Sequence, residues 1–260
     1  MQYPTISEYV KASQDASDNL DMSTKATAEE LREAFVDEWG VKYSKDGRKL
    51  LKAPQELDRT YSIRKGTKIV CDMAFAYCKS LSNVVIPDSV TSIGDGAFED
   101  WSSLSSVVLP DSITSIGNRA FNECDSLRSV VISDGVTSIG DGAFQFCSSL
   151  NDIIIPDSVT SIGIYAFGEC TSLSSLVISD SVTSIGNWAF YYCDALRSVV
   201  IPDGVTSIGV GAFIGCKSLK SLEIPDSVTS IGFGAFSYCY FPYKLKQELI
   251  SRFGDKIFGN

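Results

Sequence analysis

The chain has 260 residues, of which 44% are hydrophobic, and it carries a formal net charge of −10. This hydrophobic content excludes wholesale disorder, and the acidic balance argues against binding to nucleic acid or to an anionic membrane surface. Histidine is absent, which excludes Ser-His-Asp and Cys-His catalysis as well as His-ligated metals.

The first residues, MQYPTISEYV, show neither the basic start nor the apolar stretch of a secretory signal. No apolar run approaches the length of a membrane span, so we expect no membrane insertion. The chain is therefore either cytoplasmic or an exported protein whose signal has been removed, and the sequence leaves both open.

A helix signal follows at residues 27–39, TAEELREAFVDEW. Thr27 and Glu30 form a capping-box pattern, and the apolar spacing predicts an amphipathic helix that ends at Gly40. We expect residues 1–40 to form an N-terminal helical cap on the rest of the protein. A separate docking segment is the alternative.

The next segment, VKYSKDGRKLLK, predicts a hairpin around Asp46-Gly47, and we assign residues 41–62 to this lead-in hairpin. From residue 86 onward the string IPDSVTSIGDGAF returns with small changes every 23 residues, seven times in all. A period of 23 lies in the range of leucine-rich repeats, in which each unit forms one coil of a solenoid. A single coil buries too little apolar surface to offset its conformational entropy, so we expect residues 63–239 to fold as an array of about eight stacked coils.

The constant columns of the repeat identify the side chains that face the core. One column is phenylalanine preceded by alanine, and others hold leucine or alternating valine and isoleucine. The phenylalanine column comprises Phe75, Phe98, Phe121, Phe144, Phe167, Phe190, Phe213 and Phe236.

Within one coil, residues 80–87 predict a short strand with Val84 and Ile86 facing inward and Val85 facing outward. The strand ends at Pro87, because proline lacks a backbone donor and the Asp and Ser that follow it favour a turn. Residues 91–93 predict a second extended piece.

Residues 95–98 are too few for a regular helix, and we interpret them as a 3₁₀-like turn that places phenylalanine in the core. After the last repeat, residues 240–260 place Leu245, Leu249 and Phe253 on one helical face and predict a C-terminal helical cap. The expected fold is an α/β repeat solenoid, a right-handed leucine-rich-repeat array of short parallel strands and 3₁₀-like turns with helical caps at both ends.

Seven of the eight cysteines share one column, with Trp101 in the missing place, and Cys71 lies outside it where later coils have glycine. Identical stacked environments favour small buried hydrophobes over a disulfide framework, and the absence of a close cysteine pair argues against zinc. The column comprises Cys78, Cys124, Cys147, Cys170, Cys193, Cys216 and Cys239.

Four features together resemble the BspA-like class of leucine-rich repeats: IPDSVTSIG, an Ala-Phe pair, a cysteine three residues before leucine, and L-x-x-V-x-I-P. The resemblance covers residues 41–239, including the lead-in VKYSKDGRKLLKAP. It implies a bacterial or protist protein, commonly at a cell surface, that binds proteins or mediates adhesion and has no enzymatic activity.

Catalysis and cofactor binding have no support in the repeat. Aspartates such as Asp88 recur once per coil without a paired carboxylate, so we interpret them as turn-capping acids, with a calcium-binding edge as the alternative. We expect no catalytic residue, no metal and no cofactor.

Two sets of variable residues are candidate contacts for a protein partner of unknown identity. An outward strand column is either a ligand platform or an effect of strand propensity, and a group of aromatic residues is either a hot spot or packing between coils. The strand column is Val85, Val108, Val131, Ile154, Val177 and Val200, and the aromatic group is Phe146, Tyr165, Trp188, Tyr191 and Tyr192. We expect an interaction module for adhesion or partner recognition. The alternative is a structural spacer or scaffold part of a larger intracellular assembly, and the oligomeric state stays open.

Overall fold

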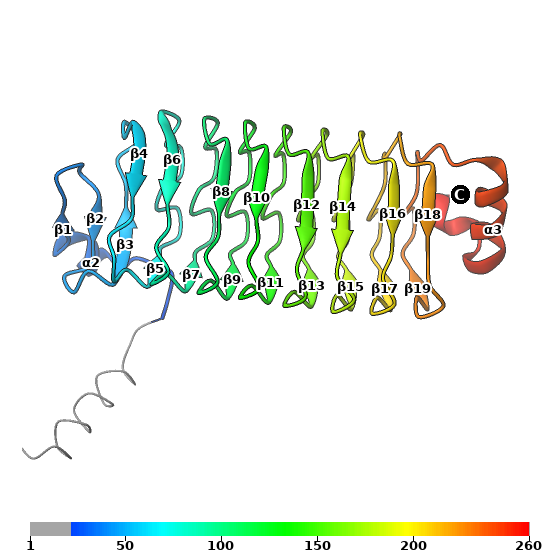
Figure 1. Ribbon diagram of the computed structural model, residues 1–260, viewed down its shortest axis with the longest axis horizontal. Helices are drawn as coiled ribbons and strands as arrows, with labels where there is room; N and C mark the ends of the chain where they lie inside the picture. The colour runs from blue at the N-terminus through cyan, green and yellow to red at the C-terminus, as the bar shows by residue number, and fades with distance from the viewer. Residues whose placement is uncertain (1–21, 260) are drawn as a thin grey trace, which may run out of the picture.

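The computed structural model describes residues 22–259, which form one elongated solenoid of stacked coils (Figure 1). Two layers of strands run along its length, and each coil contributes one strand to each layer. The predicted leucine-rich-repeat solenoid is therefore confirmed, although helices occur only near its two ends, so the body is β-rich and not α/β.

The first layer is a continuous sheet of eleven strands in the order β1-β2-β3-β5-β7-β9-β11-β13-β15-β17-β19. From β3 onward the pairing is parallel, and from β5 onward it joins residues one repeat apart, because similar sequences repeat the same backbone path. The strands are β1 (Phe35–Val36), β2 (Lys42–Tyr43), β3 (Lys49–Lys52), β5 (Ile69–Val70), β7 (Ser92–Ile93), β9 (Ser115–Ile116), β11 (Ser138–Ile139), β13 (Ser161–Ile162), β15 (Ser184–Ile185), β17 (Ser207–Ile208) and β19 (Ser230–Ile231).

The second layer, here called the paired-strand layer, holds longer strands that pair two by two: β4 with β6, β8 with β10, β12 with β14, and β16 with β18. Most of these strands alternate buried and exposed side chains, as the sequence predicts for residues 80–87, although Ser82 and Asn83 of β6 are both exposed. The strands are β4 (Arg59–Ser62), β6 (Leu81–Val85), β8 (Ser106–Val108), β10 (Ser129–Val131), β12 (Asp152–Ile155), β14 (Ser175–Ile178), β16 (Ser198–Val200) and β18 (Ser221–Glu223).

The phenylalanine column forms a ladder of stacked rings through the core. All eight rings are fully buried, and neighbouring centroids lie 5.0 to 5.7 Å apart with interplanar angles of at most 14°. Trp101 is buried in the place of the missing cysteine, with its ring centroid 5.6 Å from that of Phe98.

The segment that carries each phenylalanine differs from the 3₁₀-like turn predicted for residues 95–98. A 3₁₀ turn needs negative φ throughout, whereas Gly96 and Asp100 have φ of +59° and +52°. Ala97 N–H donates to Gly94 within the coil, while Gly96 N–H donates to Asn118 of the next coil. Gly96, with its positive φ, is the third residue of the turn, the position that has positive φ in type II turns. This conformation lets successive N–H groups donate alternately within the coil and to the next coil.

The N-terminal helix is much shorter than predicted. The capping box is present, with Thr27 Oγ1 accepting from Glu30 N–H at 3.1 Å, but α2 spans only Ala28–Arg32. The expectation of a helix over residues 27–39 is wrong beyond Arg32, because Phe35–Val36 forms β1 and pairs antiparallel with β2. Aromatic and β-branched residues suit a strand, and the neighbouring hairpin offers one to pair with. The part of the predicted cap before residue 22 lies outside the described residues.

The hairpin around Asp46-Gly47 is confirmed, since β2 and β3 pair antiparallel on either side of it. Gly47 has a φ of +73°, a conformation that glycine adopts without strain. The Asp46 carboxylate accepts from Ser44 Oγ at 2.6 Å and from Arg48 N–H at 3.0 Å, which closes the loop.

The predicted C-terminal helix is α3 (Tyr243–Phe253), and it is followed by the 3₁₀ helix η1 (Asp255–Phe258). Leu249 of α3 and Ile257 of η1 are buried in the main core. Phe236 N–H of the last coil donates to the carbonyl of Ile257 at 2.9 Å. These elements therefore cover the apolar end of the array and satisfy backbone donors that no further coil would meet.

The seven column cysteines carry free thiols and six of them are fully buried. The thiol of Cys124 donates to the carbonyl of Phe98 at 3.2 Å, and the same contact recurs in later coils. Burial raises the pKa of the Cys78 thiol to about 11 and also raises the pKa of Cys170. The column cysteines therefore occupy core positions, as expected of packing residues, and their redox state stays a prediction.

A reductant is expected to leave the melting temperature unchanged, and the column thiols are expected to resist alkylation until the protein unfolds. The thiolate is the reacting form, and a raised pKa combined with burial keeps its population low at about pH 8. Mass spectrometry of native and denatured samples treated with iodoacetamide measures this. Fewer than seven alkylated cysteines in a denatured, unreduced sample would show that the column contains disulfides.

Candidate partner-binding surfaces

The outward strand column forms a straight row on the paired-strand layer. Because side chains alternate along a strand, the residue between two buried positions faces solvent in every coil. Partners such as Val131 and Val108, or Ile154 and Val177, lie opposite each other in the pairing register. The exposed fractions are 49% for Val85, 63% for Val108, 49% for Val131, 64% for Ile154, 53% for Val177 and 59% for Val200.

A groove of about 450 Å³ crosses this row at its centre. It lies where two strand pairs meet, since β10 pairs with β8 and β12 pairs with β14. Its lining includes the exposed Val131, Ile154 and Val177 of the row, and Asp134, Asp152 and Asp157 also line it. The groove therefore combines an apolar surface with negative charge.

Four of the predicted aromatic residues come together on the flank of the later coils. The rings of Tyr165 and Trp188 stack with centroids 5.1 Å apart. Tyr191 meets Tyr165 edge-on at 5.6 Å and Tyr192 edge-on at 5.2 Å. Phe146 does not join this cluster, because Glu169 occupies the equivalent position between it and Tyr192.

These rings are largely packing elements, which limits the surface they offer. Trp188 and Tyr192 have φ of +53° and +54°, and their rings fold over glycines of the next coil. A Cβ on Gly211 would lie 2.5 Å from the Trp188 ring, and one on Gly215 would lie 2.5 Å from the Tyr192 ring. Within the cluster only Tyr192 is exposed, at 37%.

Polar contacts hold the same cluster in place. Tyr191 OH donates to the carboxylate of Glu169, and burial raises the pKa of this tyrosine. Lys217 Nζ lies 5.5 Å from the ring centroid of Tyr192 and 3.0 Å from Asp194 Oδ2. The cluster is thus a fixed, partly polar patch and not a continuous apolar strip.

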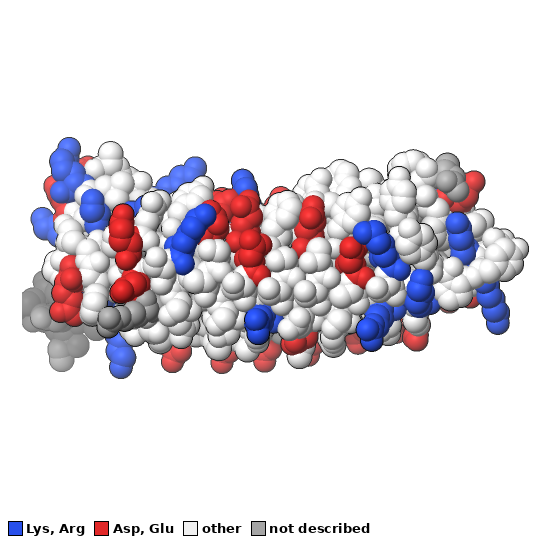
Figure 2. Space-filling view, turned by 90° about the horizontal axis from the view of Figure 1, so that it is seen from above, with Lys and Arg blue, Asp and Glu red and all other residues white. Residues whose placement is uncertain are grey.

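The repeated aspartates lie on a solvent-exposed edge of the array. The turn after each strand is closed by backbone, as Val90 N–H donates to the Pro87 carbonyl at 3.0 Å, and Asp88 is exposed. Figure 2 shows acidic side chains spaced along one long edge. Within residues 22–259 no group of three or more Cys, Asp or Glu side chains is placed to hold a metal ion, and no helix is long and apolar enough to cross a membrane.

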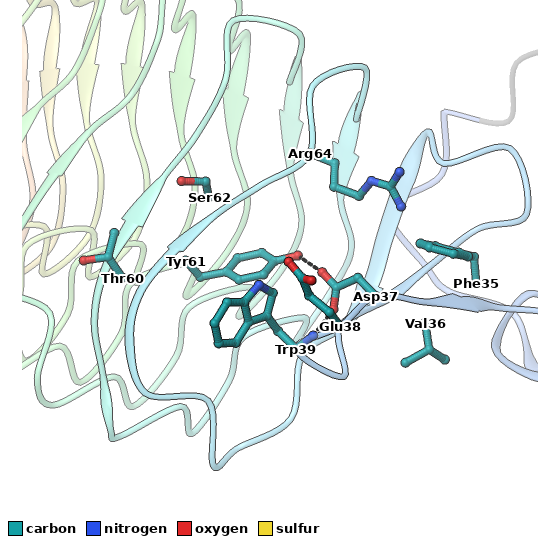
Figure 3. A pocket seen from close by; sticks show the side chains of 9 residues that line it. All are labelled: Phe35, Val36, Asp37, Glu38, Trp39, Thr60, Tyr61, Ser62 and Arg64. Carbon is teal, nitrogen blue, oxygen red and sulfur yellow. Dashed lines mark hydrogen bonds between the residues drawn. The ribbon is translucent and has the colours of Figure 1, made fainter.

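A third surface, which sequence analysis missed, lies at the N-terminal end. A cavity of about 600 Å³ separates β4 from the segment that carries β1, and Phe35, Trp39 and Arg64 line it (Figure 3). Sequence analysis missed this cavity because the helix predicted for residues 27–39 would turn Phe35 and Trp39 toward the core. We call this cavity the N-terminal slot.

A buried hydrogen-bond network fixes the floor of the slot. Tyr61 OH donates to Asp37 Oδ2 at 2.6 Å and lies 2.6 Å from Tyr43 OH. Burial, together with the neighbouring Asp37, raises the pKa of Tyr61, so the phenol stays protonated. The Arg64 guanidinium lies over the Phe35 ring, 4.7 Å from its centroid.

The sequence matches the family model of the BspA type leucine rich repeat region in six copies, over residues 67–197 and 137–260. The chain belongs to the BspA-type leucine-rich repeat family. A leucine-rich repeat protein from Eubacterium ventriosum is 27% identical with a TM-score of 0.67. The alignment covers 75% of the present chain and 51% of that one, so the present BspA-type chain spans about half the length of that relative.

The leucine rich repeat protein of T. pallidum is 30% identical with a TM-score of 0.61, and the alignment covers 87% of the present chain and 95% of that one. Both relatives are leucine-rich repeat proteins, and the family match confirms the resemblance drawn from the repeat pattern. A comparison with curated protein sequences found no match.

Proposed function

We propose that this BspA-type protein is a non-enzymatic protein-binding module whose main contact surface is the row of exposed valines and isoleucine on the paired-strand layer. The row itself carries the proposal, because six β-branched side chains, each at least 49% exposed, occupy the same outward position in six successive coils. Folded proteins seldom leave a contiguous apolar patch in water unless it meets a partner.

The backbone behind the row supports this role. The side chains are β-branched and the strands are held in register by hydrogen bonds, so little conformational entropy is lost when a partner docks. The central groove receives partner side chains, and Asp134 and Asp152 favour partners that carry basic residues. Adhesion or recognition of a host surface is a specific form of this function.

The double substitution Val131→Ser with Ile154→Ser is expected to weaken partner binding at least tenfold while changing the free energy of unfolding by only about 0.5 kcal/mol, because both side chains face solvent. Quantitative pull-downs from host and bacterial lysates, with wild type and variant as bait, measure the first effect. Thermal melting measures the second. Equal retention of every partner by both baits would contradict this choice of surface.

The aromatic cluster is the second candidate surface, because Tyr192 is exposed beside the charged pair Lys217 and Asp194. Trp188→Ser with Tyr192→Ser provides the comparison bait. If only this second bait loses partners, the contact surface is the aromatic cluster and not the exposed row. Retention of all proteins by both variants would favour the alternative role as a structural spacer or scaffold.

A further inference from the structure

The two ends of the paired-strand layer are finished differently. At the C-terminal end, the Arg252 guanidinium donates to the Ile224 carbonyl at 2.8 Å and Lys220 Nζ donates to the Tyr240 carbonyl at 2.6 Å. Arg252 and the backbone of Tyr240, both from the C-terminal segment, thus lie against the two ends of the last strand, β18. At the N-terminal end, β4 pairs only with β6 among residues 22–259, so no described strand lies against its other edge.

The register identifies which backbone groups of β4 lie on that open edge. Ile63 N–H donates to the Val85 carbonyl at 3.0 Å, which places the polar backbone groups of Tyr61 and Ile63 toward β6. Successive residues of a strand direct these groups to opposite sides, so those of Thr60 and Ser62 face away from β6. Arg64 continues the alternation, and its N–H donates to Tyr43 OH at 3.3 Å on the open side.

The open edge forms one wall of the N-terminal slot. Thr60 and Ser62 line the slot together with Phe35, Val36 and Trp39 (Figure 3). The last three side chains are 47%, 49% and 58% exposed, so the slot joins free backbone donors and acceptors to an apolar surface. The hydrogen bonds of Tyr61 to Asp37 and Tyr43 hold its floor rigid before any partner binds.

We propose that the N-terminal slot binds one extended segment of a partner protein by strand addition to β4, with an acidic residue of that segment against Arg64. Main-chain hydrogen bonds to Thr60 and Ser62 supply affinity, and alternate side chains of the segment contact Trp39, Phe35 and Val36. This site is distinct from the exposed row of the paired-strand layer and goes beyond the function proposed above.

The slot itself is lined by two carboxylates, Asp37 and Glu38, and Asp37 accepts from Tyr61 OH, so the preference for an acidic residue rests on the cations at and beyond Arg64. Within the described part of the chain no carboxylate forms an ion pair with Arg64, whose guanidinium is oriented by the Phe35 ring. An adjoining groove of about 480 Å³ shares Phe35 and Arg64, and its other charged lining residues are Lys45, Arg48 and Lys65 with one carboxylate, Asp46. Residues 22–68 carry 11 basic and 8 acidic side chains, whereas residues 69–239 carry 6 and 18.

These charges also argue against the N-terminal end of a second copy of this chain as the occupant. An identical N-terminal end would bring a second group of cations toward Arg64 and Lys65. Both β4 and the segment with Trp39 line the slot, so an extended occupant contacts both.

A displayed library of random 12-residue peptides, selected on the full chain and counter-selected on its Ser62→Pro variant, tests the proposal. Proline at position 62 removes the N–H on the open edge and leaves the pairing of β4 with β6 intact. Ser62→Ala is the matched control, because it removes the hydroxyl but keeps the N–H. Melting curves of both variants establish that each is folded.

Surviving peptides are expected to carry acidic and alternating apolar residues and to bind Ser62→Pro or Arg64→Glu at least tenfold more weakly, and Ser62→Ala less than twofold more weakly, than wild type. Hydrogen exchange should show new protection at the amides of Thr60 and Ser62. No surviving peptide, or survivors that leave these amides unprotected, would overturn the proposal. Val131→Ser with Ile154→Ser should leave this binding unchanged, which separates it from the proposed function.

Discussion

Replacement of Phe144 by alanine is expected to lower the free energy of unfolding by about 3–5 kcal/mol. The ring is fully buried and stacks between Phe121 and Phe167, with centroids 5.2 and 5.3 Å away. Its neighbours are held in place by backbone hydrogen bonds between coils, such as that from Phe144 N–H to Ala166. The cavity therefore cannot collapse, and chemical denaturation of the purified variant should report nearly its full cost.

Phe233→Ala is the matched control, since it removes the same ring from a position that is 58% exposed. We expect it to change the free energy of unfolding by about 0.5 kcal/mol. Similar losses for the two variants would mean that the array unfolds in independent parts and that the central ladder does not limit its stability.

The solenoid body could be predicted from sequence because each position of the repeat occurs in several coils, and the constant positions can be compared with the variable ones. A position such as Phe144 is constant in eight coils, so its burial needs no tertiary information, and the alternation around Val84 and Val85 is likewise seen repeatedly. The N-terminal segment occurs once. Phe35 and Trp39 suit an amphipathic helix as well as a strand followed by a loop, and only the neighbouring hairpin decides between them.

The candidate surfaces were predictable to different degrees for the same physical reason. Exposure of Val131 follows from strand alternation alone, but the groove beside it depends on where strand pairs separate, which identical repeats do not encode. The burial of Trp188 depends on its left-handed backbone and on the absence of a side chain at Gly211 in the next coil. These two conditions lie on neighbouring coils, so they can be recognised only in the three-dimensional structure.

Two glycine positions of the repeat look equivalent in sequence and have opposite structural meaning. Gly142 has a φ of +61°, and the atoms nearest to a Cβ there belong to movable side chains, Gln145 Oε1 at 3.3 Å and Arg119 Cγ at 3.4 Å. Its column also accepts Arg119, Tyr165 and Trp188. Gly163 has an ordinary φ, but a Cβ there would lie 2.7 Å from the carbonyl carbon of Gly140 in the preceding coil. The first column is therefore set by backbone conformation, and the second by how closely the coils approach.

Gly163→Ala is accordingly expected to lower the free energy of unfolding by about 3 kcal/mol, because backbone and not a movable side chain blocks the new methyl group. Gly142→Arg, which copies Arg119 of the preceding coil, should cost only about 1 kcal/mol, the price of a left-handed non-glycine residue. Denaturant titrations of both variants give the comparison. Cys71 shows why the rule applies only inside the array: it occupies the same column as Gly163, and its side chain is accommodated because the segment before it, which contains β3, is not a 23-residue coil. A Gly163→Ala protein as stable as wild type would show that adjacent coils can move apart at little cost. The glycine column that contains Gly163 would then not enforce the close stacking that aligns the exposed row from Val85 to Val200.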